Sequence, residues 1–384
     1  MDKASDYLPA LKWLRSYSGD DLKADMVAGL VVTMMLIPQS LAYALLAGVP
    51  AEVGLYASIL PLIAYSLFGS SRTLSVGPVA VVSLMTMVSL SNIVTQGTAD
   101  YLSAAIALAF LSGLFLLIMG LFKLGFVANF LSHTVVSGFI TASGIIIALS
   151  QVRHLLGISG AGDTLPTIAL SLLNSSDSIH TYTAVLGVAV LAFLVWARTA
   201  VVPICKRMGV TDSNAQLMAK LAPVLAVITT LLLAWMVDLE RAGVAVVGSI
   251  PSGLPRLAWP QLSFALFQQL WLPALSIAII GYVESVSVGK TLAAKRRENI
   301  DPNQELIALG SANIASAFSA GFPVTGGISR TVVNFDAGAK TQAASIFAAV
   351  GIAVAAMFLT PALYFLPKVT LAATIIVAVL TVVD

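Results

Sequence analysis

The fold is decided by two stretches, TLSVGPVAVVSLM at residues 73–85 and GFPVTGGISRTVVN at residues 321–334. In both, an extended approach of small residues with glycine and proline leads into an apolar run. Pro78 opens the first run, a helix position where its missing N–H costs nothing. Pro323 precedes the break in the second stretch, and the glycine pair that follows leaves backbone N–H groups uncovered. Each stretch therefore predicts a short helix that begins at a break in the chain.

The composition excludes an ordinary soluble protein. Hydrophobic residues make up 58% of the 384 residues and charged residues 10%, against roughly 45–50% and about 25% in soluble domains. The net charge of +2 implies no polyanionic partner such as nucleic acid. The single cysteine, Cys205, permits no intramolecular disulfide and no cysteine-based metal site. The chain is therefore expected to be a polytopic membrane protein.

Twelve stretches are candidates for crossing a bilayer, which takes about 20 residues of helix for roughly 30 Å of hydrocarbon. They fall near 26–46, 53–68, 76–95, 103–122, 128–149, 182–200, 217–237, 270–289, 305–320, 325–337, 342–360 and 366–383. The two interrupted stretches are the third and the tenth. Because seven spans separate them, a repeat of that odd length places them upside down relative to each other. Short, Gly/Pro-interrupted spans in matching places of two halves indicate a transporter's binding site.

The basic residues indicate which way the chain crosses the membrane. Residues 1–24 have mixed charge and lack an apolar core with a cleavage site, so no signal peptide is expected. They are expected to form a cytoplasmic interfacial segment with a short helix around Leu11, Trp13 and Leu14. With the N-terminus inside, 15 of the 20 Lys and Arg residues fall on inner segments and 4 on outer ones. The positive-inside rule therefore predicts a cytoplasmic N-terminus.

Two charges are predicted to be embedded in the membrane. Glu284 lies in the middle of LSIAIIGYVESVSVGKTL, where an ionised group costs about 2.5–3.5 kcal/mol. Arg330 is the only other deeply placed charge expected. The helix starts of spans three and ten would aim partial positive charge at the same depth and favour an anion. The alternatives are that the glycines only permit close helix packing, and that Glu284 and Arg330 form a static pair that stabilises the fold.

Polar residues of the first span are further candidates. Gln39 and Tyr43 are four residues apart in MLIPQSLAYALL and hence lie on one helical face. Pro38 beside them predicts a kink or break, so they either line a cavity there or hold helices together. The sequence contains no nucleophile–base constellation and no metal-ligand spacing. We therefore expect no cofactor, no metal and no enzymatic activity.

Five runs resemble the sulfate permease (SulP) family of anion transporters, from about residue 20 to residue 384. They are PQSLAYALLAGVPAEVGLYAS, LSVGPVAVVSL, GYVESVSVGKTLAAK, NQELIALGSANIASAF and GGISRTVVNFDAGAKTQ. The last three most resemble the plant and bacterial proton-coupled sulfate transporters. The resemblance implies an all-α polytopic membrane fold of two inverted seven-span repeats, divided into a core domain and a gate domain. It also implies that the anion binds in the core, between the half-helices of spans three and ten.

The resemblance also suggests roles for single residues. The substrate-binding positions expected from it and from the break are Gln39, Tyr43, Val79, Ala80, Gly327, Ser329 and Arg330. Glu284 matches the eighth-span acid that proton-coupled members use. Sodium-coupled bicarbonate members carry a hydroxyl residue one turn beyond that acid, where this chain has Val288. Proton coupling is therefore favoured over sodium coupling.

The domain organisation is expected to be a shortened form of the family pattern, which has fourteen spans and a cytosolic STAS domain. We expect the N-terminal segment at 1–24, a first repeat with spans one to seven at 25–238, and an outer connection at 239–269. A second repeat at 270–384 is expected to hold spans eight to twelve only. Two gate helices and the STAS domain would then be absent.

The leading hypothesis is a secondary active, proton-coupled sulfate symporter that works by elevator-type movement of the core against the gate. Moving the two negative charges of sulfate into a negative cell costs about 4.6 kcal/mol per 100 mV, so a coupling cation is needed, and Glu284 could carry the proton. The alternatives are a bicarbonate or dicarboxylate symporter of the same fold, and an anion channel or motor-like membrane protein. We expect a homodimer in the inner (plasma) membrane, with a small inorganic anion, protons and lipid as its partners.

Overall fold

The computed structural model describes residues 8–130, 133–158, 165–175 and 178–380. The chain divides into two compact units, and each unit is built from two separate parts of the sequence. Unit one consists of Met1–Val136 and Gly253–Ala356, and unit two of Ser137–Ser252 and Met357–Asp384. Each unit thus combines a part of the first expected repeat with a part of the second, as a core and a gate domain would.

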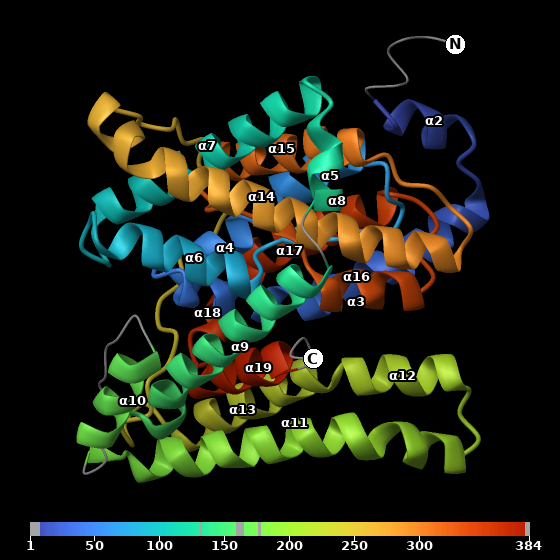
Figure 1. Ribbon diagram of the computed structural model, residues 1–384. Coiled ribbons are helices and arrows are strands. Elements are labelled where there is room, and N and C mark those ends of the chain that lie inside the picture. Colours follow the sequence, from blue (N-terminus) through green and yellow to red (C-terminus); the bar gives the residue numbers. More distant parts are fainter. Residues whose placement is uncertain (1–7, 131–132, 159–164, 176–177, 381–384) are drawn as a thin grey trace. The chain divides into compact units, whose positions relative to one another are not determined.

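Unit one holds the helices and strands of the candidate site (Figure 1). Its elements are α2 (Ala10–Arg15), α3 (Gly19–Leu46), α4 (Ala51–Tyr56), α5 (Leu60–Phe68), β1 (Val76–Gly77), α6 (Ala80–Ser91), α7 (Ala99–Leu121), η1 (Leu124–Phe126), α8 (Val127–Phe130), α14 (Phe264–Lys295), α15 (Pro302–Phe318), β2 (Thr325–Gly326), α16 (Ile328–Asp336) and most of α17 (Ala343–Phe358). Unit two holds most of α9 (His133–Leu156), then α10 (Leu165–Asn174), α11 (Thr181–Arg207), α12 (Asp212–Lys220), α13 (Ala222–Val237), α18 (Thr360–Leu363) and α19 (Lys368–Leu380).

Every one of the twelve apolar stretches contains a helix, which confirms the expected all-α fold class. Among the described residues, five helices are long and apolar enough to cross a membrane alone, and a sixth span results if the pair Asn214–Lys220 and Ala222–Val237, bent by 43°, counts as one. The helix α6 has 12 residues and α16 has 9, which at about 1.5 Å per residue cannot reach across the hydrocarbon. Spans three and ten are therefore half-helices, as the sequence predicts.

Local chemistry explains where the first helices begin. The expected short helix forms as α2, in which Trp13 is buried, whereas Leu11 and Leu14 stay exposed.

The first long helix, α3, begins at Gly19, earlier than expected, because Ser18 and Asp21 form a capping box that satisfies its first N–H groups. Pro38 lies inside α3 and does not end it, so of the kink or break expected there, the structure excludes a break.

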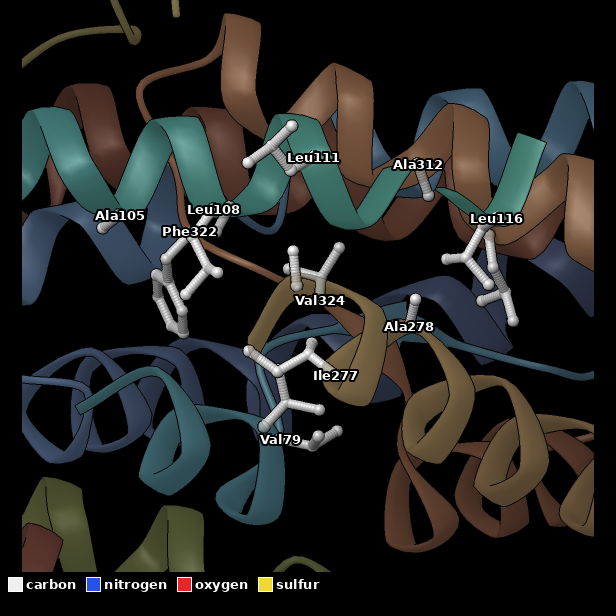
Figure 2. Packing of buried hydrophobic residues seen from close by; sticks show 14 of the residues in the cluster. Val79, Ala105, Leu108, Leu111, Leu116, Ile277, Ala278, Ala312, Phe322 and Val324 are labelled. Carbon is white, nitrogen blue, oxygen red and sulfur yellow. The ribbon is translucent and has the colours of Figure 1, made fainter. Parts of the chain in front are cut away.

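The hydrophobic core of unit one lies where α7, α14 and α15 pack together. Figure 2 shows Leu108, Leu111 and Leu116 of α7 beside Ala312 of α15 and Val324. The backbones of α7 and α15 approach closely, since a Cβ added at Gly113 would lie 2.8 Å from the carbonyl oxygen of Gly310. Small residues at helix contacts permit this approach in membranes.

Unit two is held by packing between α11, α13 and α19. Its small core contains Val190 and Leu194 of α11, Ala226 of α13 and Ala373 of α19. The opposite faces remain apolar and exposed, with Trp196 of α11 among their large side chains. An apolar exposed face of this kind suits contact with lipid rather than with water.

Candidate functional site

The two breaks predicted from the sequence pair with each other. β1 and β2 form an antiparallel pair in which Val76 is opposite Gly326 and Gly77 is opposite Thr325. The N–H of Gly327 adds a bond to the Ser75 carbonyl oxygen at 3.2 Å. The starts of α6 and α16, far apart in the sequence, are thereby brought together within unit one.

Both half-helices begin without a side-chain cap. Val79 is the N-cap of α6 and Gly327 is the N-cap of α16, and neither position shows a side-chain cap hydrogen bond. The first intrahelical bonds are those from Ser83 N–H to Val79 and from Thr331 N–H to Gly327. The N–H groups of the preceding first turns thus have no acceptor within their own helices. Such groups, with the helix dipole, favour an anion.

Arg330 is buried at the junction of the two breaks. Its side chain is 2% exposed, and its Nη1 donates a 2.6 Å hydrogen bond to the carbonyl oxygen of Pro78. Its Nε and Nη2 atoms have no hydrogen-bond partner among the described residues. A Cβ at Gly327 would lie 2.9 Å from both Cζ and Nη2 of Arg330, so this glycine makes room for the guanidinium. Burying a cation with two nitrogens that lack hydrogen-bond partners is costly, and an anion beside it would lower this cost.

Glu284 and Tyr43 lie near this arginine. Both side chains are buried, and electrostatic interactions connect each of them with Arg330 and with each other. Within the described part of the chain, no carboxylate oxygen lies within 4.0 Å of the Arg330 guanidinium, and Oε2 of Glu284 has no hydrogen-bond partner. The direct ion pair considered from the sequence is therefore not formed.

The remaining predicted residues differ in exposure. Gln39 is half-buried on α3, one turn before Tyr43, and Ala80 is half-buried at the first position of α6. Val79 is buried, whereas Ser329, the second residue of α16, is exposed. The junction of spans three and ten thus contains the buried cation of Arg330 and, one residue before it in α16, the exposed hydroxyl of Ser329.

The helix α14 fixes the strand that precedes α16. The Thr325 hydroxyl donates to the Gly281 carbonyl oxygen at 2.7 Å and lies 2.7 Å from the Ser285 hydroxyl. Oγ of Ser285 in turn accepts a 2.8 Å bond from the N–H of Gly326. Residues three and four apart share a helical face, so Glu284 lies on the face of α14 that holds β2.

Further side chains that the sequence does not single out lock the same segment. Asn313 of α15 donates to the Val324 carbonyl oxygen at 2.8 Å and accepts from the Val324 N–H at 2.9 Å. On the other side, the hydroxyl of Thr331 accepts from the Ser75 N–H, and Asn334 donates to the Thr73 carbonyl oxygen. Irregular backbone inside a membrane needs hydrogen-bond partners. Polar residues in the spans that flank the two breaks are therefore the sequence signal that could have predicted these contacts.

Several known proteins are similar to this chain in sequence or in structure. Residues 22–384 match the model of the sulfate permease family. The chain belongs to the sulfate permease family. It is 36% identical over 386 residues to "Sulfate transporter 4.1, chloroplastic" of Arabidopsis thaliana, covering 100% of this chain and 55% of the relative. It is 33% identical to "Probable sulfate transporter Rv1739c" of Mycobacterium tuberculosis (strain ATCC 25618 / H37Rv), covering 99% of this chain and 65% of the relative.

Solved structures with a similar fold cover nearly the whole chain. "The overall structure of SLC26A9" matches with a TM-score of 0.88 and 26% identity, covering 99% of this chain and 61% of that one. "The transmembrane domain of a cyanobacterium bicarbonate transporter BicA" matches with a TM-score of 0.82 at 20% identity, covering 96% and 90%, and shows the fold alone. These matches confirm the inverted-repeat membrane fold. The chain spans little more than half the length of the Arabidopsis relative. The relatives named here are transporters and not enzymes, as the sequence predicts.

In this member of the sulfate permease family, two carboxylates besides Glu284 are buried within the protein. Asp25 of α3 accepts bonds from the N–H groups of Lys340 and Thr341 and from the Thr341 hydroxyl. Glu305 of α15 accepts from Tyr65, Ser70 and Ser71. Both carboxylates are surrounded by donors from segments distant in the sequence, which a single pass along the chain cannot reveal.

Proposed function

We propose that this sulfate permease is a secondary active anion transporter, a proton-coupled sulfate symporter with elevator-type alternating access. The observation that carries the proposal is Arg330, whose buried Nε and Nη2 atoms have no partner at the junction of two uncapped helix starts. Sulfate offers four acceptor oxygens and two negative charges. It would satisfy the guanidinium and the first-turn N–H groups together, and charge-assisted bonds of this kind are the strong ones.

The proposed roles of the site residues follow from their placement. Arg330 and the N–H groups at Ala80 and Ser329 would bind the anion, and the N-cap positions Val79 and Gly327 would shape the site. Gln39 and Tyr43 would contact the anion from α3. Because side chains four apart share a face, both can serve one ligand.

Glu284 is the group proposed to carry the proton. When Glu284 is ionised, its charge offsets that of Arg330, and the anion is bound less strongly. When it is protonated, the full charge of Arg330 is available to the anion. Proton and anion then favour each other's binding, and this coupling is reciprocal in affinities. One proton carried with sulfate lowers the electrical work of entry from about 4.6 to about 2.3 kcal/mol per 100 mV.

Unit one is proposed as the moving element of the transport cycle. All proposed site residues lie in Met1–Val136 and Gly253–Ala356, so a movement of unit one as a body carries the complete site with it. We also propose repeats at 25–238 and 270–384, a homodimer, a cytoplasmic N-terminus and location in the plasma membrane. One relative bears a name that places it in the chloroplast, so an organelle membrane is the alternative that localisation of a tagged chain would detect.

Uptake of radiolabelled sulfate into proteoliposomes tests the proposal. An inward proton gradient should drive accumulation, and Arg330→Ala should abolish it because the buried cation of the junction is lost. Excess bicarbonate or a dicarboxylate should compete weakly. Uptake that is unaffected by the proton gradient, or that bicarbonate blocks at equal concentration, would refute proton-coupled sulfate transport. Uptake that Arg330→Ala leaves unchanged would place the site elsewhere.

A further inference from the structure

The C-terminal end of α16 is held by a cation from another helix. Arg296, which follows the last residue of α14, donates from its Nη1 to the Ala339 carbonyl oxygen and from its Nη2 to the Phe335 carbonyl oxygen at 3.0 Å. Its Cζ lies 4.3 Å from the centre of the Phe335 ring. Figure 1 shows α16 beside α14. The guanidinium is therefore fixed at the end of α16 opposite to the end that carries Arg330.

Because α16 is short, both of its ends influence the same ligand. The helix has 9 residues, and about 1.5 Å of rise per residue makes it about 13 Å long. A helix carries roughly half a positive charge at its N-terminus and half a negative charge at its C-terminus. At this length the negative end weakens the attraction of the positive end for an anion. The last turn of α16 has no basic residue of its own, so Arg296 supplies from α14 the cation that offsets its negative end.

Other charged groups lie around Arg296. Electrostatic interactions connect it with Glu298, Arg72, Asp25 and Asp336. Arg72 and Glu298 are 3.4 Å apart and offset each other, which leaves the carboxylates of Asp25 and Asp336 near the end of α16. Without Arg296, the negative end of the helix and these two carboxylates would act together against an anion at the other end.

We propose that Arg296 is a specificity-determining residue that makes the anion site favour dianions over monoanions. The inference rests on the proposed anion site at the junction of α6 and α16. Arg296 lies about 16 Å from that site, counting the helix rise from Ile328 to Phe335 and a hydrogen-bond length at each end. Its charge acts on the anion across this distance without contact.

The charge of the anion decides the size of the effect. The interaction energy of one fixed charge with an anion is proportional to the charge of the anion, so a factor in the affinity of a monoanion is squared for a dianion. At about 16 Å, with partial screening by water and salt, the loss of one charge should raise the Kd of a monoanion roughly two- to threefold. The Kd of sulfate should then rise roughly four- to tenfold.

Displacement of radiolabelled sulfate from the purified full chain by sulfate and by perchlorate tests this, at one ionic strength kept with potassium gluconate. Both anions are tetrahedral, but sulfate carries two charges and perchlorate one. Arg296→Gln should raise the Kd roughly four- to tenfold for sulfate and roughly two- to threefold for perchlorate. Arg296→Met, which keeps an aliphatic chain over the Phe335 ring without the charge, is the second neutral variant and should give the same pair of factors.

Two further variants serve as controls, and thermal unfolding shows whether each variant is folded. Arg296→Lys keeps the charge but cannot reproduce the paired bonds of the guanidinium, and it should change either Kd by less than about twofold. Arg72→Gln removes a cation whose side chain is 54% exposed and paired with Glu298. Because solvent screens that charge, either Kd should again change by less than about twofold.

Several results would overturn the proposal. Equal fold-changes for sulfate and perchlorate in the neutral variants, or a loss in Arg296→Lys as large as in Arg296→Gln, would show that Arg296 only holds α16 in place. Unchanged affinities in a folded neutral variant would remove any role in recognition. Sulfate binding that Arg330→Ala leaves unchanged would refute the anion site and this inference with it. Binding that depends on Arg330 and not on the charge of Arg296 would overturn this inference alone.

Discussion

A single methyl group at Gly327 should weaken anion binding. Gly327 has φ of −91°, which alanine adopts freely, so Gly327→Ala acts through space rather than through backbone strain. Its Cβ would lie 2.9 Å from Cζ and Nη2 of Arg330 and 3.2 Å from Cγ1 of Val79. The guanidinium must move, and the 2.6 Å bond to the Pro78 carbonyl oxygen opposes that movement.

The size of the effect follows from the bond that is lost. A hydrogen bond to a charged group contributes about 1.5–3 kcal/mol, so Gly327→Ala should raise the Kd for sulfate by roughly 10- to 150-fold. Gly77→Ala brings its Cβ only to 3.4 Å from Nη2 and should have a smaller effect. Gly19→Ala, where nothing lies within 4 Å, serves as the matched control.

Calorimetric titration of purified protein with sulfate measures these affinities, and thermal unfolding shows whether each variant is folded. The expected order of Kd is Gly19→Ala equal to wild type, then Gly77→Ala, then Gly327→Ala. A folded Gly327→Ala that binds sulfate within twofold of wild type would show that the placement of Arg330 does not determine recognition.

Three further substitutions separate coupling from support of the site. Glu284→Gln mimics the protonated acid and should keep sulfate binding while uptake no longer rises between outside pH 7.5 and 5.5; a retained pH response would mean that another group carries the proton. Asn313→Leu leaves the buried N–H and carbonyl of Val324 unpaired and should lower the free energy of unfolding by about 2–4 kcal/mol. Denaturant or thermal unfolding measures this loss. An unchanged unfolding midpoint would contradict the stabilising role of the bonds between Asn313 and Val324. Glu305→Ala removes the acceptor of Tyr65 and of the backbone at Ser70 and should lower the free energy of unfolding by about 2–5 kcal/mol. Sulfate uptake at low temperature should be retained, because Glu305 has a structural role only.

The breaks in spans three and ten could be predicted from the sequence because their causes are local. A proline fixes the backbone angle φ of its own residue, and consecutive glycines give their own residues a wider range of conformations. The structure has the N-caps at Val79 and Gly327; Pro78 marks the first of these starts to within two residues, and the assignment of Val79 itself came from the family resemblance. At Pro38, where a kink or a break is expected, α3 continues without a break.

The partners of the charged residues could not be predicted from the sequence. Arg330 bonds to Pro78, 252 residues away, and Glu305 bonds to Ser70, 235 residues away. These contacts depend on the register of β1 and β2 and on the packing of α15 against the end of α5. The hydrophobic periodicity of the sequence specifies neither of them. Glu305 and Asp25 stand near helix ends in the sequence and look solvated there, yet distant N–H and hydroxyl groups surround them.

The most direct test of the anion site is an experimental structure with selenate, a tetrahedral dianion whose selenium can be located by anomalous scattering. We predict one selenium peak at the junction of α6 and α16, with selenate oxygens within hydrogen-bond distance of Nη2 of Arg330 and of the backbone N–H groups at Ala80 and Ser329. A peak elsewhere in unit one, with the junction empty at saturating selenate, would contradict anion recognition by the paired half-helices.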